Sequence, residues 1–121
     1  MLIKVDAKEM ESGNPPPQPL IDEMNVLMAR WSEAGVMVAA EGLRPTSEGA
    51  RLRLGGGKLD VSDGPFTEAK EVIGGFFILK TATKAEAIAL TREFLALHER
   101  VLGPDFVIEC ELRALEGAPE E

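Results

Sequence analysis

Apolar residues recur along this chain with two spacings, one typical of helices and one typical of strands. Residues 2–6 have the pattern of a short strand. Apolar positions three and four apart predict a helix over residues 19–34 with one buried face. Pro19 suits the first helical position and Gly35 ends the helix. The chain thus begins with a strand and an amphipathic helix, joined by a proline-rich loop.

A second helix is predicted over residues 84–102. Thr83 and Glu86 have the spacing of a capping box, and Gly103 with Pro104 is a stop signal. Apolar residues cover about half of this helix, and the single histidine, His98, falls in the middle of the apolar arc. We therefore expect His98 to face inward.

The remaining apolar residues have the pattern of strands. Residues 51–54 and 58–61 alternate on both sides of three glycines, which predicts a β-hairpin with one wet face. Residues 76–79 are all large and apolar, so both faces of that strand should be buried. Further strands are expected over residues 36–40 and 106–115.

The order of these elements predicts an α+β fold, a ferredoxin-like sandwich with an extra β-hairpin. Two helices cover only one face of such a sheet. Because residues 76–79 are apolar on both faces, a second copy of the chain is the simplest cover for the open face. We expect a homodimer packed sheet to sheet, a single domain over residues 1–116, and an acidic tail over residues 117–121 that frays.

A rigid corner joins the hairpin to the most apolar strand. Asp63 can accept backbone N–H bonds across the turn, Gly64 tolerates unusual backbone angles, and Pro65 fixes its own φ. Phe66 then anchors the turn to an apolar surface. A carboxylate at such a corner forms turns more often than it catalyses reactions, so turn formation is the favoured role of Asp63.

Composition and charge exclude several classes of partner. The formal net charge is −8 and the chain has no cluster of lysine and arginine, so nucleic acid and anionic membranes should be repelled. No apolar run approaches the length of a membrane span and the N-terminus is not a signal peptide, so we expect a cytoplasmic protein. The triple glycine lacks the ending of a phosphate loop, and His98 with the lone Cys110 makes no metal pattern. We expect neither cofactor nor metal, and Cys110 to be a core residue.

The corner also carries a family resemblance. Residues 63–71, Asp-Gly-Pro-Phe-Thr-Glu-Ala-Lys-Glu, followed by Gly74-Gly75-Phe76, resemble the signature of the DGPF group of YCII-related proteins. Segments that support the resemblance are residues 34–36, 41–45, 50–53 and 108–113. The resemblance implies a dimeric α+β barrel of ferredoxin-like subunits, from a family that is largely uncharacterised biochemically.

The resemblance also implies candidate chemistry. Some YCII-related proteins carry a His and an Asp close together, proposed as a catalytic pair; the Asp corresponds to Asp63. The only histidine is His98, late in the second helix rather than early in the chain. Members of the DGPF group are often associated with extracytoplasmic-function sigma factors, which would imply a regulatory setting rather than a reaction.

Two function classes follow from these residues. The first is a small-molecule site in the dimeric barrel, which binds or transforms an organic compound; whether it is an enzyme stays open. Its catalytic candidates are Asp63 and His98, and its ligand-binding candidates are Glu41, Arg44, Asp63, Phe66 and Lys70. The second is a non-catalytic accessory protein in a sigma-factor stress-response pathway, in which Asp63 caps a turn, Glu41 is solvated and His98 is packed.

Overall fold

The computed structural model describes residues 1–117, and residues 118–121 of the expected tail lie outside it. The strands are β1 (Leu2–Asp6), β2 (Met37–Gly42), β3 (Ala50–Gly55), β4 (Lys58–Asp63), β5 (Glu71–Leu79) and β6 (Glu109–Glu111). The helices are α1 (Ala7–Glu11), α2 (Gln18–Glu33) and α3 (Lys84–Leu102), with a 3₁₀ turn, η1 (Thr46–Glu48).

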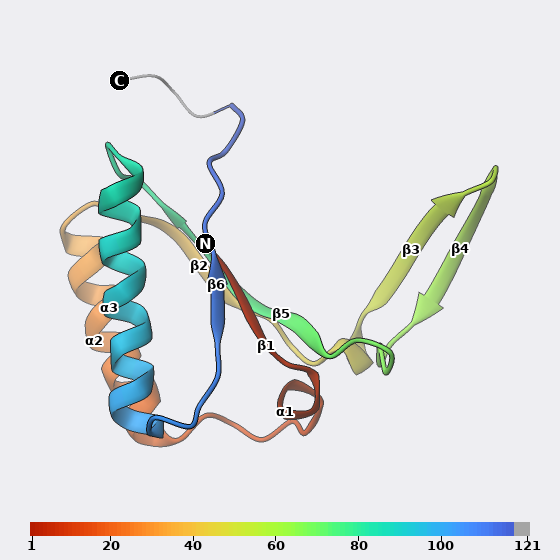
Figure 1. Ribbon diagram of the computed structural model, residues 1–121, viewed down its shortest axis with the longest axis horizontal. Coiled ribbons are helices and arrows are strands. Elements are labelled where there is room, and N and C mark those ends of the chain that lie inside the picture. The colour runs from red at the N-terminus through yellow and green to blue at the C-terminus, as the bar shows by residue number, and fades with distance from the viewer. Residues whose placement is uncertain (118–121) are drawn as a thin grey trace.

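Four strands form the main sheet, in the order β2-β5-β1-β6, and all neighbours in it are antiparallel. Helices α2 and α3 lie side by side on one face of this sheet (Figure 1). Apart from α1, η1 and the hairpin, the elements run β-α-β-β-α-β. The predicted α+β class is confirmed. Within the described residues one chain forms no closed barrel, and the dimeric barrel stays a prediction.

The helices follow their local signals closely. Helix α3 spans the predicted residues, and α2 begins one residue before the predicted start. The Thr83 hydroxyl accepts a hydrogen bond from the Glu86 N–H at 3.2 Å. The Glu86 carboxylate accepts from Ala82 N–H at 3.0 Å, so the reciprocal bond of the cap is made one residue earlier than a standard capping box places it.

The sequence pattern missed α1 and overestimated the last strand. Asp6 caps α1 by accepting hydrogen bonds from the N–H groups of Lys8 and Glu9. The helix has only five residues, too few to show the apolar periodicity by which a helix is predicted. The strand predicted over residues 106–115 pairs with β1 only over Glu109–Glu111. Strand β1 is five residues long and ends at α1, so it offers β6 few partners.

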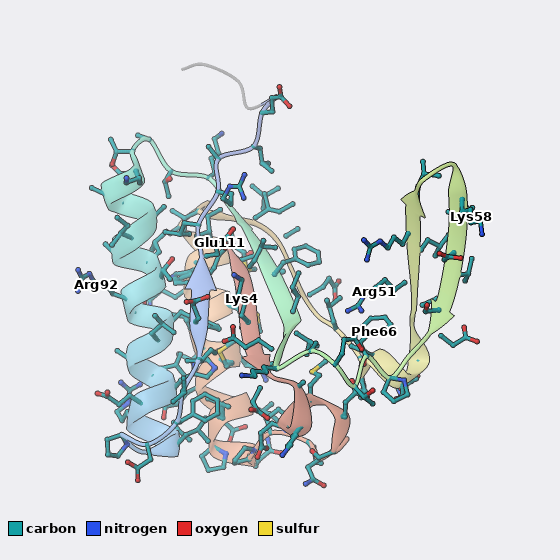
Figure 2. All side chains as sticks on the ribbon, turned by 45° about the vertical axis from the view of Figure 1, so that its right-hand side comes forward. Lys4, Arg51, Lys58, Phe66, Arg92 and Glu111 are labelled. Atoms are coloured by element: carbon teal, nitrogen blue, oxygen red, sulfur yellow. The ribbon has the colours of Figure 1, made fainter. Side chains whose placement is uncertain are left out.

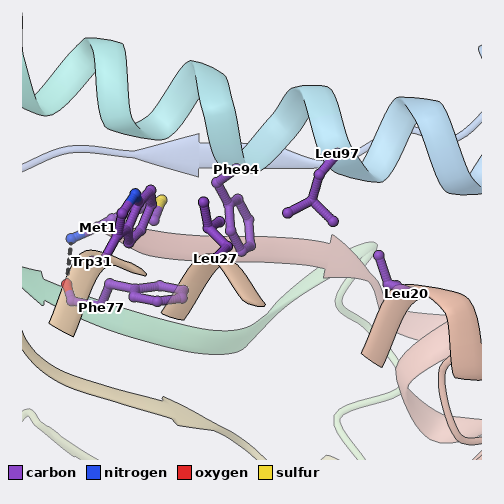
Figure 3. Close-up of a cluster of buried hydrophobic side chains, with 7 residues drawn as sticks. All are labelled: Met1, Leu20, Leu27, Trp31, Phe77, Phe94 and Leu97. Atoms are coloured by element: carbon purple, nitrogen blue, oxygen red, sulfur yellow. Dashed lines mark hydrogen bonds between the residues drawn. The ribbon is translucent and has the colours of Figure 1, made fainter. Parts of the chain in front are cut away.

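The core lies between the sheet and the two helices (Figure 3). Phe77 of β5 makes edge-to-face contacts with Trp31 of α2 and Phe94 of α3, with ring centroids 5.5 and 5.3 Å apart. The Met1 ammonium group donates a hydrogen bond to the Phe77 carbonyl at 2.8 Å. Burying these aromatic rings is worth several kcal/mol each, about 3–5 for a phenylalanine truncated to alanine.

The open face of the sheet carries the apolar residues that the helices do not cover. Phe77 is buried, whereas its neighbours Phe76 and Ile78 point to the opposite face and are half-buried. One chain therefore buries Phe77 on one face of this strand and the other face only in part, and burial of the second face by another copy of the chain stays a prediction. The register between β1 and β5 shifts between Ile3 and Lys4, which leaves Gly74 of β5 without a partner in β1, as in a β-bulge.

Strands β3 and β4 form a separate hairpin that projects away from the helices (Figure 1). Lys58 lies at its far end (Figure 2). The hairpin was predicted with one wet face, but every residue of both strands is exposed. This correction has a physical cause: a two-stranded ribbon buries its apolar face only against another layer, and residues 1–117 supply no such layer.

Candidate functional site

A cavity of about 720 Å³ lies where the hairpin joins the main sheet. One wall comes from β1 and β5, a second from the segment after β2 through η1, and a third from the corner after β4. The residues that line it are Lys4, Leu43, Arg44, Pro45, Thr46, Glu48, Gly49, Ala50, Arg51, Phe66, Glu71, Val72 and Ile73. Its surface is mainly apolar, with charged groups at a few points.

Thr46 ties three separate segments together beside this cavity. Glu11 at the end of α1 accepts hydrogen bonds from the Thr46 N–H at 2.7 Å, the Thr46 hydroxyl and the Ser47 N–H at 3.2 Å. The Thr46 hydroxyl oxygen in turn accepts from the Phe66 N–H at 3.1 Å. The hydrogen bond from the Thr46 hydroxyl is the main cause that lowers the pKa of Glu11. Helix α1, η1 and the corner are therefore held in one arrangement.

Gly64 allows the corner to approach η1 closely. Its N–H donates to the Gly49 carbonyl at 2.9 Å, and its peptide bond to Pro65 is cis. A Cβ atom at this position would lie 1.6 Å from the Thr46 carbonyl oxygen. Only glycine therefore fits here without moving the backbone.

Three basic side chains line the cavity, and each already has an acidic partner. Lys4 pairs with Glu111 at 2.9 Å and with Glu109 at 3.4 Å, and the hydrogen bond with Glu111 is the main cause that raises its pKa (Figure 2). Arg44 pairs with Glu48 at 2.8 Å, and the pKa of Arg44 is raised by that hydrogen bond.

Arg51 has two partners at the corner. Its guanidinium lies 4.0 Å from the centre of the Phe66 ring and pairs with Glu68 (Figure 2). The cation–π contact is worth about 0.5–1 kcal/mol at an exposed site. Arg51 thus orients Phe66 at the mouth of the cavity.

Two of the predicted ligand-binding residues, Arg44 and Phe66, line this cavity. The other three lie outside its lining and are exposed: Glu41 pairs with Phe76 across β2 and β5, Asp63 ends β4, and Lys70 precedes β5. The Lys70 carbonyl accepts a hydrogen bond from the Ala7 N–H at 2.9 Å, so its backbone has a structural role.

His98 lies in the core, as its place in the apolar arc predicted. Its Nδ1 is 2.8 Å from the Phe94 carbonyl oxygen, and its ring lies 4.4 Å from the Phe94 ring and stacks on Phe106 at 6.3 Å. Burial lowers the pKa of His98. Helix α3 and strand β4 lie on opposite sides of the chain (Figure 1), so one chain does not bring His98 and Asp63 together.

Sequence reasoning missed Glu11, Thr46 and Arg51. Glu11 and Thr46 are 35 residues apart along the chain, and no local sequence pattern predicts a contact between residues so far apart. The sequence predicts Arg51 only as a solvent-facing residue of a hairpin, and its contact with the Phe66 ring is visible only in the folded chain. Among residues 1–117, no cluster of three or more His, Cys, Asp or Glu side chains could hold a metal ion. No helix in that part of the chain has the length and apolarity of a membrane span.

Comparison with known proteins adds a family and one distant relative. The family model described as YCII-related domain matches residues 1–94, which includes every residue of the cavity. An uncharacterised protein of Rhizobium meliloti (strain 1021) is 34% identical over 71 residues. That match covers 59% of this chain and 57% of the relative, so the chain spans little more than half of the relative's length.

Proposed function

This chain belongs to the YCII-related family, and on that premise we propose that it binds a small organic molecule in the cavity beside Phe66. The observation that carries the proposal is the cavity itself. Its volume of about 720 Å³ lies within the range of small-molecule sites, and its lining combines apolar surface with a few polar groups. The hydrogen bonds of Thr46 connect two of its walls, and a wall that is already ordered reduces the ordering cost of binding.

The charges favour an uncharged or zwitterionic ligand over a strong anion. Lys4, Arg44 and Arg51 each have a carboxylate partner, so part of their positive charge is neutralised and a phosphate group would lie close to those carboxylates. A net charge of −8 also repels anions at a distance. A ligand with an apolar body and a polar group that joins an existing ion pair fits the lining better.

The proposal includes a homodimer formed through the open face of the sheet, the dimeric α+β barrel that the resemblance to the DGPF group implies. Half-buried Phe76 and Ile78 support it, because they lie on the face without helices. Asp63, Glu41 and Lys70 belong to the binding site in this proposal if the second copy brings them to the cavity. The cytoplasm is the proposed compartment.

The test starts from native mass spectrometry of the protein purified without added ligand. Ligand-observed NMR then screens uncharged and zwitterionic fragments, with inorganic phosphate as the comparison. We expect fragment binding to weaken at least about tenfold in Arg51→Ala. The matched control is Arg53→Ala, on the same strand and the same face but outside the cavity lining. We expect this control to bind as the wild type does.

Two results would contradict the proposal. If no fragment binds and no compound co-purifies, the result favours the alternative function, an accessory protein in a sigma-factor pathway, which needs no ligand. If phosphate binds more tightly than any fragment, the argument from paired charges is wrong.

A further inference from the structure

We propose that the β3–β4 hairpin is an arm that packs its apolar face on a second copy of this chain. The apolar face consists of Leu52, Leu54, Leu59 and Val61. Their exposed fractions are 62%, 76%, 63% and 63% in one chain. A monomeric protein rarely leaves four large aliphatic side chains together in water.

The register gathers these four residues on one face. Leu52 lies opposite Val61 and Leu54 lies opposite Leu59, and residues two apart on a strand share a face. The other face carries the pairs Arg51 with Ser62 and Arg53 with Asp60. The ribbon is therefore amphipathic, with the alternation of a sheet that is covered on one side.

The hairpin has little support of its own. A two-stranded hairpin is at best marginally stable in water without a third strand or a packed layer. Its strands hydrogen-bond to each other, and it is fastened to the body at its base, through the Gly64 N–H to the Gly49 carbonyl and through Arg51 on Phe66. A layer that covers the apolar face would supply the missing stabilisation.

The area fits a second copy. A fully exposed side chain of this size presents roughly 60–120 Å² of apolar surface, and these four keep 62–76% of their surface exposed in one chain. In a symmetric dimer two arms and the surfaces that they meet would bury about 600–1,400 Å² in total. A specific interface needs about 1,000 Å². The arms supply a large part of that, and the open sheet face can supply the rest.

Charge also favours a second copy. Residues 50–63 hold three basic and two acidic residues, a net charge of +1, so the remainder of the chain carries −9. The basic residues lie on the face opposite the leucines, so they add a weak long-range attraction to the acidic body of a second copy rather than contacts at the docked face. An anionic lipid surface would repel that body. The arm also starts at the cavity, because Ala50 and Arg51 line it. Docking of the arm would therefore fix one wall of the cavity.

The test measures the dimer dissociation constant by analytical ultracentrifugation in the absence of ligand, so its result does not depend on whether the cavity binds a small molecule. The leucine variant and its control separate the arm from the homodimer of the proposed function. The double variant Leu54→Thr/Leu59→Thr keeps strand-forming residues but makes one rung of the apolar face polar. Its matched control, Arg53→Thr/Asp60→Thr, changes the neighbouring rung on the opposite face. Both alter exposed positions, so the body should fold, which Trp31 fluorescence checks.

We expect a dimeric wild type, a dissociation constant raised at least about a hundredfold in the leucine variant, and a change of less than about threefold in the control. Hydrogen exchange of residues 50–63 in the wild type gives a second measurement, and protection should disappear on dilution to monomer. The inference is overturned by a monomeric wild type, by a leucine variant that dimerises like the wild type, or by a hairpin that exchanges freely in the dimer.

Discussion

Replacing Thr46 with valine removes the hydroxyl that connects the corner to α1 and leaves the shape of the side chain nearly unchanged. The Phe66 N–H loses its acceptor at 3.1 Å, and a hydrogen bond of this kind contributes about 0.5–1.5 kcal/mol to the free energy of unfolding. A loss of about 1 kcal/mol lowers the Tm of a domain of this size by about 3–5 °C. Thr67→Val is the matched control, because Thr67 is exposed beside the same corner.

The same substitution should change how stability depends on pH. The Thr46 hydroxyl is the main cause that lowers the pKa of Glu11 below its ordinary value of 4.5. A carboxyl group with a lowered folded-state pKa stabilises the fold above its unfolded pKa, and this contribution disappears as pH falls through the folded-state pKa. The difference in stability between wild type and Thr46→Val should therefore be largest near neutral pH and decrease below pH 4.5.

Urea denaturation measures both effects, with fluorescence of the single tryptophan as the signal. Trp31 is 1% exposed in the core, so its emission should change when the chain unfolds. The reasoning is refuted if Thr46→Val is no less stable than Thr67→Val. It is also refuted if the difference between wild type and Thr46→Val grows as pH falls.

Two further predictions concern Gly64 and Cys110. Gly64→Ala places a Cβ against the Thr46 carbonyl, so we expect the free energy of unfolding in urea to fall by about 1–3 kcal/mol. Gly42→Ala is the control and should cost less, because a Cβ there meets no atom within 4 Å; equal losses would contradict the close approach at Gly64. Burial raises the pKa of Cys110 to about 11, so the native thiol should react slowly with a disulfide reagent near neutral pH and quickly in urea. Rapid labelling of the native protein would show that this thiol is accessible.

Local signals predicted the two long helices, α2 and α3, and the hairpin. The capping residue Thr83 and the stop at Gly103 define α3, because the bonds that they make lie within four residues of each other along the chain. The inward position of His98 followed from the helical period alone. The alternation around the three glycines likewise predicted the hairpin, whose turn needs positive φ at Gly56 and Gly57.

The apolar pattern shows which face of a strand is apolar, but it does not show which layer covers that face. The alternation places Leu52 and Phe76 on apolar faces, and one chain leaves the first exposed and the second half-buried. The homodimer remains the prediction that would reconcile pattern and exposure.

The α+β class, the two long helices and the family could be predicted from the sequence alone, because their signals lie close together along the chain. The cavity and the contacts that hold the corner could not be predicted in this way. Thr46, Arg51 and Phe66 line the cavity from three separate segments, and Glu11 binds Thr46 from a fourth, whereas helix α3 and strand β4 lie on opposite sides of the molecule (Figure 1). Such contacts depend on how whole elements pack, and packing sums many weak interactions between residues far apart in sequence.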